Sequence, residues 1–343
     1  MELSHKQIES LKEMLAQPRL RIVILSHTNP DGDAVGSSLA WAEVLRARGH
    51  EVTCVVPNKY PYFLDWMPGI EEVVVFKTDT EGRAVKAIAE ADVLFCLDFN
   101  AVSRLEILSE TIQGNTTARR VLIDHHLQPD EGFDIVFSHP ESSSTCFLVY
   151  SLVEAMYGTG AITRRMGELL YVGMMTDTGN FAFSHLTPEL FRAVAVLLEK
   201  GIDIPGIHNS VYNAYTEGRA RLFGYAINRK MALIEDGTVA YMSLLESEMR
   251  RFQFQQGDSE GFVNYALTIK KVKMSAMFLA HRKFIRISLR SRGDVDVNLF
   301  ARKYFNGGGH KNAAGGKSFL SMEETIDHYI RSVREFAEEG HLG

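Results

Sequence analysis

The sequence predicts a two-domain α/β protein, in which a doubly wound, mainly parallel sheet precedes a second, smaller α+β domain. Its 343 residues exceed what one hydrophobic core usually serves. Strand and helix patterns alternate in the first half of the chain, whereas hairpin patterns follow in the second. The composition, 45% hydrophobic and 23% charged, is that of an ordinary globular protein. These three observations together favour two packed domains of different architecture.

Five short apolar runs in the first half predict the strands of the parallel sheet. They lack strict alternation, which is typical of strands covered on both faces. Helical patterns lie between them, so each strand is expected to return to the sheet through a helix. Ligands of such sheets gather at the carboxyl ends of strands. The five runs are residues 21–26, 51–56, 73–76, 93–99 and 120–123.

A domain boundary is expected after the helical pattern of residues 187–200. Two glycines and a proline occur in residues 201–206, a composition that ends regular structure. We therefore predict a first domain of residues 1–200, a largely helical linker of residues 201–229 and a second domain of residues 230–343.

The second half is predicted to contain two hairpins and two helices. Asp236-Gly237 lies between two strand patterns and is a strong turn signal. A second hairpin is expected to turn near residues 281–283. The helical patterns cover about residues 297–304 and 322–338.

Charge, cysteine content and hydropathy limit the classes of function. A net charge of −6 argues against a protein that coats long duplex nucleic acid, but it permits a small anionic substrate held by local arginines. No apolar run approaches the roughly 20 residues of a membrane span, and the first residues lack a signal-peptide pattern, so we expect a cytoplasmic protein. Cys54, Cys96 and Cys146 form no CxxC pair and are expected to be reduced core residues. The sequence does not decide the oligomeric state.

The segment HTNPDGD, residues 27–33, directly follows the first predicted strand. Pro30 and Gly32 suit a tight loop, in which Asp31 and Asp33 can point toward neighbouring but different ligand positions. His27 adds an imidazole. The alternative is that Asp33 caps the next helix and His27 is a surface residue.

Three further acidic or histidine-containing positions follow apolar elements. Asp98 comes after the fourth strand pattern, Asp124-His125-His126 after the fifth, and Asp177 at the end of an apolar helical pattern. Adjacent histidines in an extended stretch point to opposite faces, so one is expected to ligate metal and the other to meet substrate. Asp98 and Asp177 would each be ordinary turn residues if they stood alone.

Together these positions predict a dinuclear metal site. Four carboxylates in one place would repel each other without cations. Mixed carboxylate and imidazole ligation favours Mn²⁺, with Mg²⁺ or Co²⁺ as alternatives, and the absence of cysteine ligands argues against structural zinc. Two ions about 3.5 to 4 Å apart stabilise both oxygens of an in-line displacement at phosphorus. The four carboxylates are those of Asp31, Asp33, Asp98 and Asp177.

The second domain offers an anion site. Its segment FNGGGHKNAAGG, residues 305–316, lets backbone N–H groups of Gly308 and Gly309 approach a phosphate, with His310 and Lys311 as further donors. A flexible linker is the alternative. Arg290 ends a strand pattern and suits a bidentate grip on phosphate; Arg286, four residues earlier, stays unassigned, as do Arg104 and Asn264.

This order of motifs resembles the DHH phosphoesterase superfamily in its form with a DHHA1 domain, and the likeness covers nearly the whole chain. It rests on HTNPDGD, Asp98, the Asp124-His125-His126 triplet, Asp177 and the GGGH sequence. Length and domain order are most similar to the bacterial nanoRNase and 3′-phosphoadenosine 5′-phosphate (pAp) phosphatase subgroup.

The resemblance implies roles for these residues. His27, Asp31 and Asp98 would hold one ion; Asp33, Asp98, His125 and Asp177 would hold the other. Asp98 would therefore bridge the two ions. His126 would contact the scissile phosphate, and Asp124 would orient the histidines. Arg290 and His310 would bind a substrate phosphate.

The resemblance also implies the substrate class. We expect hydrolysis of short single-stranded RNA to 5′-mononucleotides and dephosphorylation of pAp. A cyclic di-AMP or pApA phosphodiesterase and an inorganic pyrophosphatase remain enzymatic alternatives. A non-catalytic nucleotide-binding module would have lost a metal ligand, and none is missing here.

Overall fold

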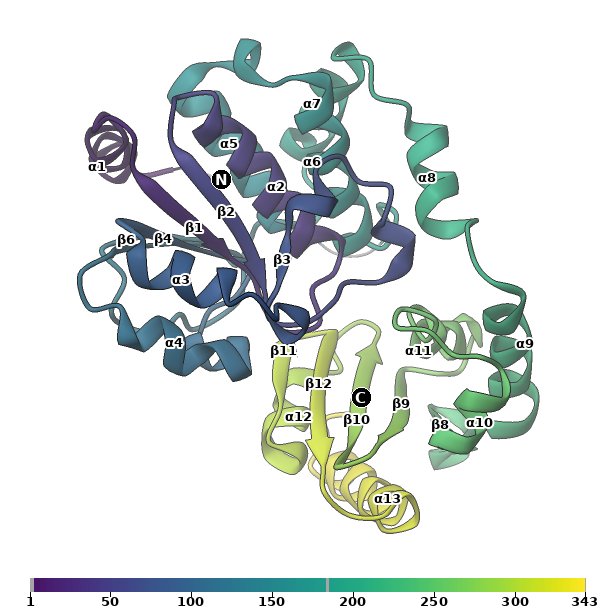
Figure 1. The fold of residues 1–343 in the computed structure, drawn as a ribbon. Helices are drawn as coiled ribbons and strands as arrows, with labels where there is room; N and C mark the ends of the chain where they lie inside the picture. The colour runs from purple at the N-terminus through teal and green to yellow at the C-terminus, as the bar shows by residue number, and fades with distance from the viewer. Residues whose placement is uncertain (1–2, 183–184, 343) are drawn as a thin grey trace. The chain divides into compact units, whose positions relative to one another are not determined.

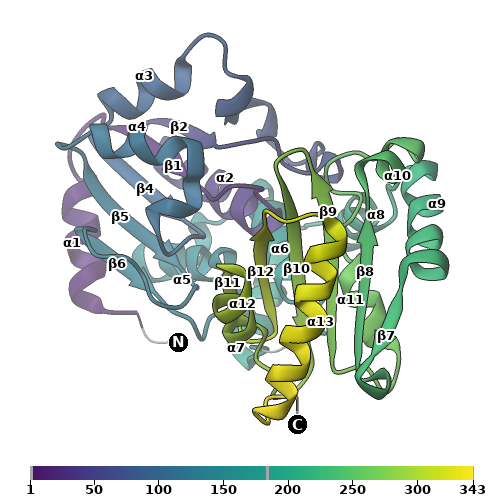
Figure 2. The same ribbon diagram turned by 90° about the horizontal axis from the view of Figure 1, so that it is seen from below.

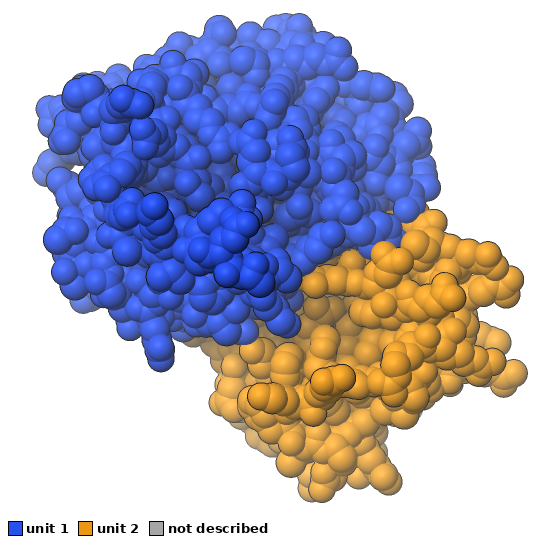
Figure 3. Space-filling view, viewed as in Figure 1, with its two compact units in different colours: residues 1–214 blue, residues 215–343 orange. Residues whose placement is uncertain are grey.

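The computed structural model describes residues 3–182 and 185–342. These residues form two compact units, Met1–Ala214 and Tyr215–Gly343 (Figure 3). The division falls inside the segment 201–229 that the sequence indicates as a linker. That segment is helical as expected, with α8 (Ile204–Tyr212) in the first unit and α9 (Glu217–Tyr225) in the second.

The first unit is built on a parallel six-stranded sheet, which confirms the predicted fold class (Figures 1 and 2). The strand order is β3-β2-β1-β4-β5-β6, so the chain changes direction across the sheet between β1 and β4. The carboxyl ends of these two central strands are where such sheets bind ligands. The short strand β6 was not predicted. The strands are β1 (Arg21–Leu25), β2 (Glu51–Val56), β3 (Val74–Val75), β4 (Val93–Leu97), β5 (Arg119–Asp124) and β6 (Ile135–Ser138).

Helices cover both faces of this sheet, as a doubly wound fold requires. Helices α3 and α4 contribute Ala84, Ile88 and Ile112 to a buried cluster on one face. Helices α2, α5 and α6 pack against one another on the other. The helices of the unit besides α8 are α1 (His5–Leu15), α2 (Gly32–Arg46), α3 (Arg83–Glu90), α4 (Ser109–Gly114), α5 (Thr145–Tyr157), α6 (Arg164–Asp177) and α7 (Pro188–Glu199).

Glycines allow α2 and α6 to approach closely. A Cβ atom at Gly36 would lie 2.5 Å from the carbonyl oxygen of Leu169, and one at Gly32 would lie 2.6 Å from Thr176 Oγ1. Neither position therefore tolerates a larger side chain without movement of the neighbouring helix. This contact brings the last residue of α6, Asp177, toward the first turn of α2.

The second unit contains a mixed six-stranded sheet of order β11-β12-β10-β9-β8-β7. Strands β8 and β9 are parallel and the other pairs are antiparallel. The predicted hairpin at Asp236-Gly237 is confirmed as β7–β8. The strands are β7 (Ala232–Ile234), β8 (Val239–Leu244), β9 (Met274–His281), β10 (Phe284–Ser291), β11 (Gly308–His310) and β12 (Ala313–Ser318).

Two apolar clusters lie on the faces of this second sheet. One includes Phe300 of α12 (Val297–Phe305) and Tyr329 of α13 (Met322–Glu338). The other includes Phe262 of α11 (Phe262–Tyr265) and Met249 of α10 (Glu246–Arg251). Among the described residues of the chain, no helix is both long and apolar enough to cross a bilayer.

The glycine-rich segment of this unit is a hairpin and not an open loop, which corrects the sequence interpretation. Strands β11 and β12 pair antiparallel across residues 308–315. A Cβ atom at Gly307 would lie 1.9 Å from the carbonyl oxygen of Gly315, and one at Gly309 would lie 2.4 Å from that of Ala313. Close backbone packing therefore requires glycine here, whether or not an anion binds.

Candidate active site

The loop after β1 holds its side chains through local hydrogen bonds. His27 Nδ1 lies 2.9 Å from the carbonyl oxygen of Thr28. A carbonyl oxygen can only accept, so Nδ1 carries a proton, and Nε2 has a lone pair when the ring is neutral. Asn29 has a positive φ of 57° and is tied to Asn58, whose Oδ1 accepts from Asn29 N at 2.8 Å. This pair fixes the loop on which His27 and Asp31 lie.

Asp31, and not Asp33, caps the following helix. Asp31 Oδ1 accepts from the backbone N–H groups of Asp33 and Ala34 at 3.0 and 3.1 Å. The sequence alternative, in which Asp33 is merely the cap, is therefore wrong. Asp31 fulfils the capping role while its side chain still lies beside His27 and Asp98.

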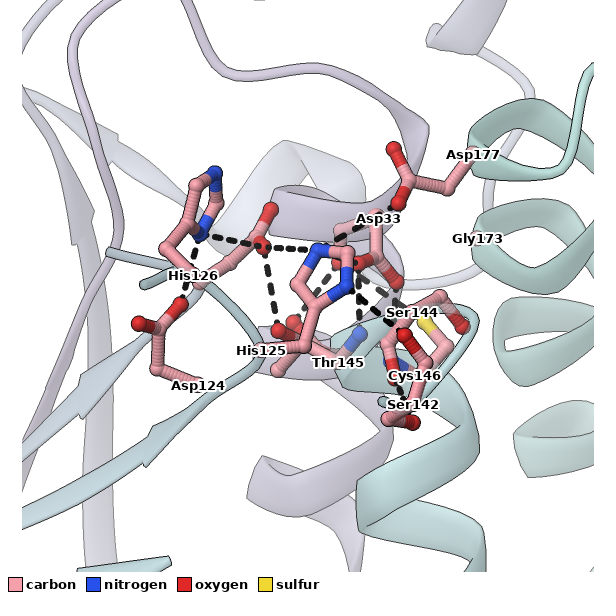
Figure 4. Close-up of polar contacts among 12 residues, drawn as sticks. Asp33, Asp124, His125, His126, Ser142, Ser144, Thr145, Cys146, Gly173 and Asp177 are labelled. Carbon is pink, nitrogen blue, oxygen red and sulfur yellow. Dashed lines mark hydrogen bonds and ion pairs between the residues drawn. The ribbon is translucent and has the colours of Figure 1, made fainter. Parts of the chain in front are cut away.

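The carboxylate of Asp33 is fully buried at the N-terminus of α5 (Figure 4). Its Oδ2 accepts from Thr145 N at 2.7 Å and its Oδ1 from Cys146 N at 2.8 Å. Burial, followed by the charges of Asp98 and Asp177, raises the pKa of Asp33 well above its ordinary value. The charged form thus needs a nearby cation.

Asp98 stands between two histidines. It follows β4 with a positive φ of 63° and is 2% exposed. Its Oδ2 lies 3.4 Å from His27 Nε2, and its Oδ1 lies 3.5 Å from His125 Nε2. Each oxygen therefore faces a different imidazole, which is the arrangement that a bridging carboxylate needs.

The DHH triplet, residues 124–126, places its two imidazoles side by side. Strand β5 ends at Asp124, and the rings of His125 and His126 are 5.0 Å apart at 71°. The expectation that they point to opposite faces is wrong, because that alternation holds only in extended backbone. The two histidines nevertheless have different hydrogen-bond partners.

Separate groups orient the two histidines. His125 Nδ1 lies 3.2 Å from the carbonyl oxygen of Ser142 and donates to it, so Nε2 faces the carboxylates and has a lone pair for an ion when the ring is neutral. His126 Nδ1 lies 2.7 Å from Asp124 Oδ1. Burial lowers the pKa of His126 although Asp124 opposes this. Asp124 thus orients one histidine and a backbone carbonyl orients the other, whereas the resemblance gave Asp124 both.

The donor set fits divalent cations. Ligands about 2.1 Å from one ion are roughly 3.0 to 3.4 Å from each other at octahedral or tetrahedral angles. His125 Nε2 lies 3.3 Å from Asp177 Oδ2 and 3.8 Å from Asp33 Oδ2. These contacts are too long for good hydrogen bonds but near the spacing of ligands around an ion. Among the groups whose donor atoms all lie within 4.8 Å of one another are His27, Asp31 and Asp98, and Asp33, His125 and Asp177.

The second unit places Arg290 and His310 in one row across its sheet. Ala313 of β12 is the register partner of Arg290 on β10 and of His310 on β11. Arg290 Nη1 donates to the carbonyl oxygen of Leu289 at 3.0 Å. Lys311, expected as a phosphate donor, forms an exposed ion pair with Asp294 at 2.8 Å.

The backbone N–H groups of the GGGH sequence are partly committed. Gly307 N donates to Ala301 O at 3.1 Å, and Gly309 N donates to Asn298 Oδ1 at 3.0 Å. The Gly309 N–H group proposed as a phosphate donor is therefore already engaged. Gly308 is half-buried in the same hairpin.

Sequence reasoning missed the residues that support these side chains. Ser142 and Thr145 belong to a run of Ser and Thr residues before an apolar helical pattern, a composition that signals a helix start. Nothing in the sequence pairs Asn58 with Asn29. Gly173 permits α6 to approach Asp33, since a Cβ atom there would lie 2.5 Å from Asp33 Oδ1.

Two family models match this chain in the order that the motifs suggested. The DHH family, N-terminal domain, matches residues 21–174, and the DHHA1 domain matches residues 236–339. The chain belongs to the DHH family. It is accordingly a DHH phosphoesterase, a hydrolase acting on phosphate esters. The suspected resemblance and the enzyme class are both confirmed.

The similarity to known proteins covers nearly the whole chain. A curated relative from Thermus thermophilus, named "Bifunctional oligoribonuclease and PAP phosphatase NrnA", is 27% identical over 96% of this chain and 94% of its own length. The crystal structure of an exopolyphosphatase-related protein from Bacteroides fragilis is 40% identical, with a TM-score of 0.90 and 97% of each chain covered.

A more distant structure shares the fold. The crystal structure of RecJ in complex with Mn²⁺, from Thermus thermophilus, is 12% identical, with a TM-score of 0.55. The match covers 97% of this DHH phosphoesterase and 54% of RecJ.

Proposed function

We propose that this DHH phosphoesterase hydrolyses short single-stranded oligoribonucleotides to 5′-mononucleotides and removes the 3′-phosphate of pAp. The observation that carries the proposal is Asp98, whose two oxygens face His27 and His125 at 3.4 and 3.5 Å. Similarity to the Thermus thermophilus oligoribonuclease and PAP phosphatase along 96% of the chain supports this substrate class.

Six side chains would hold two divalent ions, with Mn²⁺ preferred because nitrogen and oxygen donors are mixed. When bound, such a pair supplies Lewis acidity to a phosphoryl oxygen and lowers the pKa of water. The orientation of His27 and His125 supports this assignment, since the Nδ1 of each lies near a backbone carbonyl oxygen and each Nε2 points toward carboxylates, where it can bind an ion once its proton has left. The six are His27, Asp31, Asp33, Asp98, His125 and Asp177.

His126 is the side chain that we assign to the scissile phosphate. Its Nδ1 is held by Asp124 at 2.7 Å, which fixes the ring so that Nε2 faces the substrate. Hydrolysis adds a water oxygen to phosphorus and breaks the bond from phosphorus to the 3′ oxygen. The 3′ oxygen then takes a proton, and a 5′-phosphate remains on the released nucleotide. The same displacement on pAp releases inorganic phosphate from its 3′ position.

The second unit would bind a phosphate of the substrate. Arg290 and His310 occupy one row of its sheet, on either side of Ala313. A guanidinium and an imidazole in neighbouring strands suit an anion with several acceptor oxygens. Gly308 would let the anion approach the backbone there, whereas the Gly309 N–H group already donates to Asn298 Oδ1.

The substrate proposal is tested by incubating the protein and Mn²⁺ with RNA dimers to pentamers, pAp, pApA, cyclic di-AMP and pyrophosphate. We expect mononucleotide release from the short RNAs and phosphate release from pAp, both abolished in Asp98→Ala. Asp92→Ala is the matched control, because Asp92 precedes the same strand at its opposite end and binds Arg21. Turnover confined to the di-AMP compounds or pyrophosphate would refute the substrate assignment.

The phosphate anchor has its own test. Arg290→Ala should raise KM for short RNA, because a charge-assisted contact is removed without a change in the metal ligands. Arg282→Ala, in the exposed turn between β9 and β10, serves as control. Equal KM and kcat in Arg290→Ala and the wild type would show that Arg290 is not the anchor.

A further inference from the structure

We infer that Thr145 is a positioning residue that sets the orientation of Asp33 and Asp98 before a metal ion arrives. The inference rests on the proposed metal-dependent function and adds to it a residue outside the metal ligands. Thr145 is the first residue of α5 and is fully buried. It is the residue through which two carboxylates from different parts of the chain are tied to one helix.

Thr145 contacts each carboxylate through a different donor. Its backbone N–H donates to Asp33 Oδ2 at 2.7 Å, and its hydroxyl donates to Asp98 Oδ1 at 3.0 Å. Cys146 N donates to the other Asp33 oxygen at 2.8 Å. Asp33 is the second residue of α2 and Asp98 follows β4, so α5 joins side chains carried by two separate elements.

The hydroxyl of Thr145 is not needed to start the helix. Ser144 is the N-cap of α5, and its Oγ accepts from Phe147 N at 3.0 Å. Ser142 Oγ donates in turn to the carbonyl oxygen of Ser144 at 3.0 Å. The capping role is thus filled by a neighbour, which leaves the contact with Asp98 as the hydroxyl's hydrogen bond in the described structure.

Repulsion between the carboxylates explains why the hydrogen bonds from Thr145 matter. The closely spaced carboxylates of Asp33, Asp98 and Asp177 would separate in the absence of a cation. A carboxylate oxygen has about two acceptor directions, so one can bind a donor while the other remains for an ion. Fixing Asp33 and Asp98 in advance removes most of the reorganisation that metal binding would otherwise require. Loss of the hydroxyl should therefore weaken metal binding by about 10- to 100-fold.

The test compares Thr145→Val with Thr145→Ser. Valine keeps the shape and the backbone N–H but removes the hydroxyl, whereas serine restores it. Thr325→Val is the matched control, because Thr325 is also fully buried and hydrogen-bonded, to Ser318 in the second unit. Each protein is stripped with a chelator and titrated with Mn²⁺ alone by calorimetry, without any substrate.

We expect Thr145→Val to lose about 10- to 100-fold in Mn²⁺ affinity, with Thr145→Ser and Thr325→Val close to the wild type. The Mn²⁺ concentration for half-maximal phosphoesterase activity should rise in parallel. Wild-type affinity in a folded Thr145→Val protein would overturn the inference, as would an equal loss in Thr145→Ser. Should Thr145→Val not fold, Thr145→Ala makes the same comparison with Thr145→Ser.

The two proposals fail in different ways. Wild-type protein that binds no Mn²⁺ would overturn the metal-dependent function itself. Unchanged Mn²⁺ binding in Thr145→Val, with activity on short RNA intact, would overturn only the role of Thr145.

Discussion

Gly173→Ala is expected to damage the site although Gly173 touches no substrate. The added Cβ would lie 2.2 Å from Cys146 Sγ and 2.5 Å from Asp33 Oδ1. Both distances are far below van der Waals contact, so either α6 must move away from α2 or the Asp33 carboxylate must leave its two backbone donors. Each response displaces a proposed metal ligand, either Asp177, the last residue of α6, or Asp33 itself.

The expected magnitude follows from two opposing effects. Overpacking a buried position costs about 1–3 kcal/mol. Alanine in place of glycine inside a helix returns about 0.5–1 kcal/mol. The net loss in the free energy of unfolding should therefore be on the order of 1–2 kcal/mol, which leaves the protein folded. Metal affinity should fall by about 10- to 100-fold, as when other supporting groups of metal sites are changed.

The assay measures Mn²⁺ affinity by calorimetry and unfolding by denaturant in parallel. Gly167→Ala is the control on the same helix, because its Cβ would meet the flexible side chains of Ile202 and Leu197 at 2.9 and 3.6 Å. We expect Gly167→Ala to bind Mn²⁺ like the wild type. A folded Gly173→Ala protein with wild-type Mn²⁺ affinity would refute the argument that close approach of α6 sets the position of Asp33.

Four further outcomes are expected. Asp124→Asn should lower kcat about 10- to 100-fold with little change in Mn²⁺ affinity, because the Asp124 side chain is hydrogen-bonded to His126, which is not a proposed ligand; equal loss of Mn²⁺ binding would contradict this. Mn²⁺ at about 1,000 times its dissociation constant should stabilise the chelator-treated protein by about 4 kcal/mol in denaturant titrations. The affinity of the protein for Mn²⁺ should rise with pH, because the raised pKa values of Asp33 and His125 make protons compete with the ion. An affinity that does not change with pH would exclude that competition. Burial raises the pKa of Cys54 and Cys96 to about 12, so neither should react with a thiol reagent until the protein unfolds.

The alternation of strand and helix patterns was sufficient to predict the first unit. Apolar runs without alternation require a sheet covered on both faces, and the parallel order follows from the helices between them. The strand ends then bring His27, Asp98 and His125 to one edge of the sheet. Strand β6 was missed because its four residues are too short to give a period.

In the second unit, the sequence did not predict the structure of the glycine-rich segment, residues 305–316. Glycine serves a flexible loop, an anion site and a tightly packed hairpin equally well, so residues 305–316 do not distinguish these from the sequence. The decisive fact is the 1.9 Å approach that a Cβ atom at Gly307 would make to Gly315 O, and this arises only when β11 and β12 pair.

The sequence by itself determined the fold class, the order of the motifs and the chemical character of the candidate ligands, because these depend on local periodicity and on residue type. Tertiary structure alone decided which oxygen faces which histidine and that Thr145 joins Asp33 to Asp98. The two contacts of Thr145 link residues 112 and 47 positions apart in the chain. No local pattern encodes such distant contacts, since they exist only once α2, α5 and α6 pack together on the sheet.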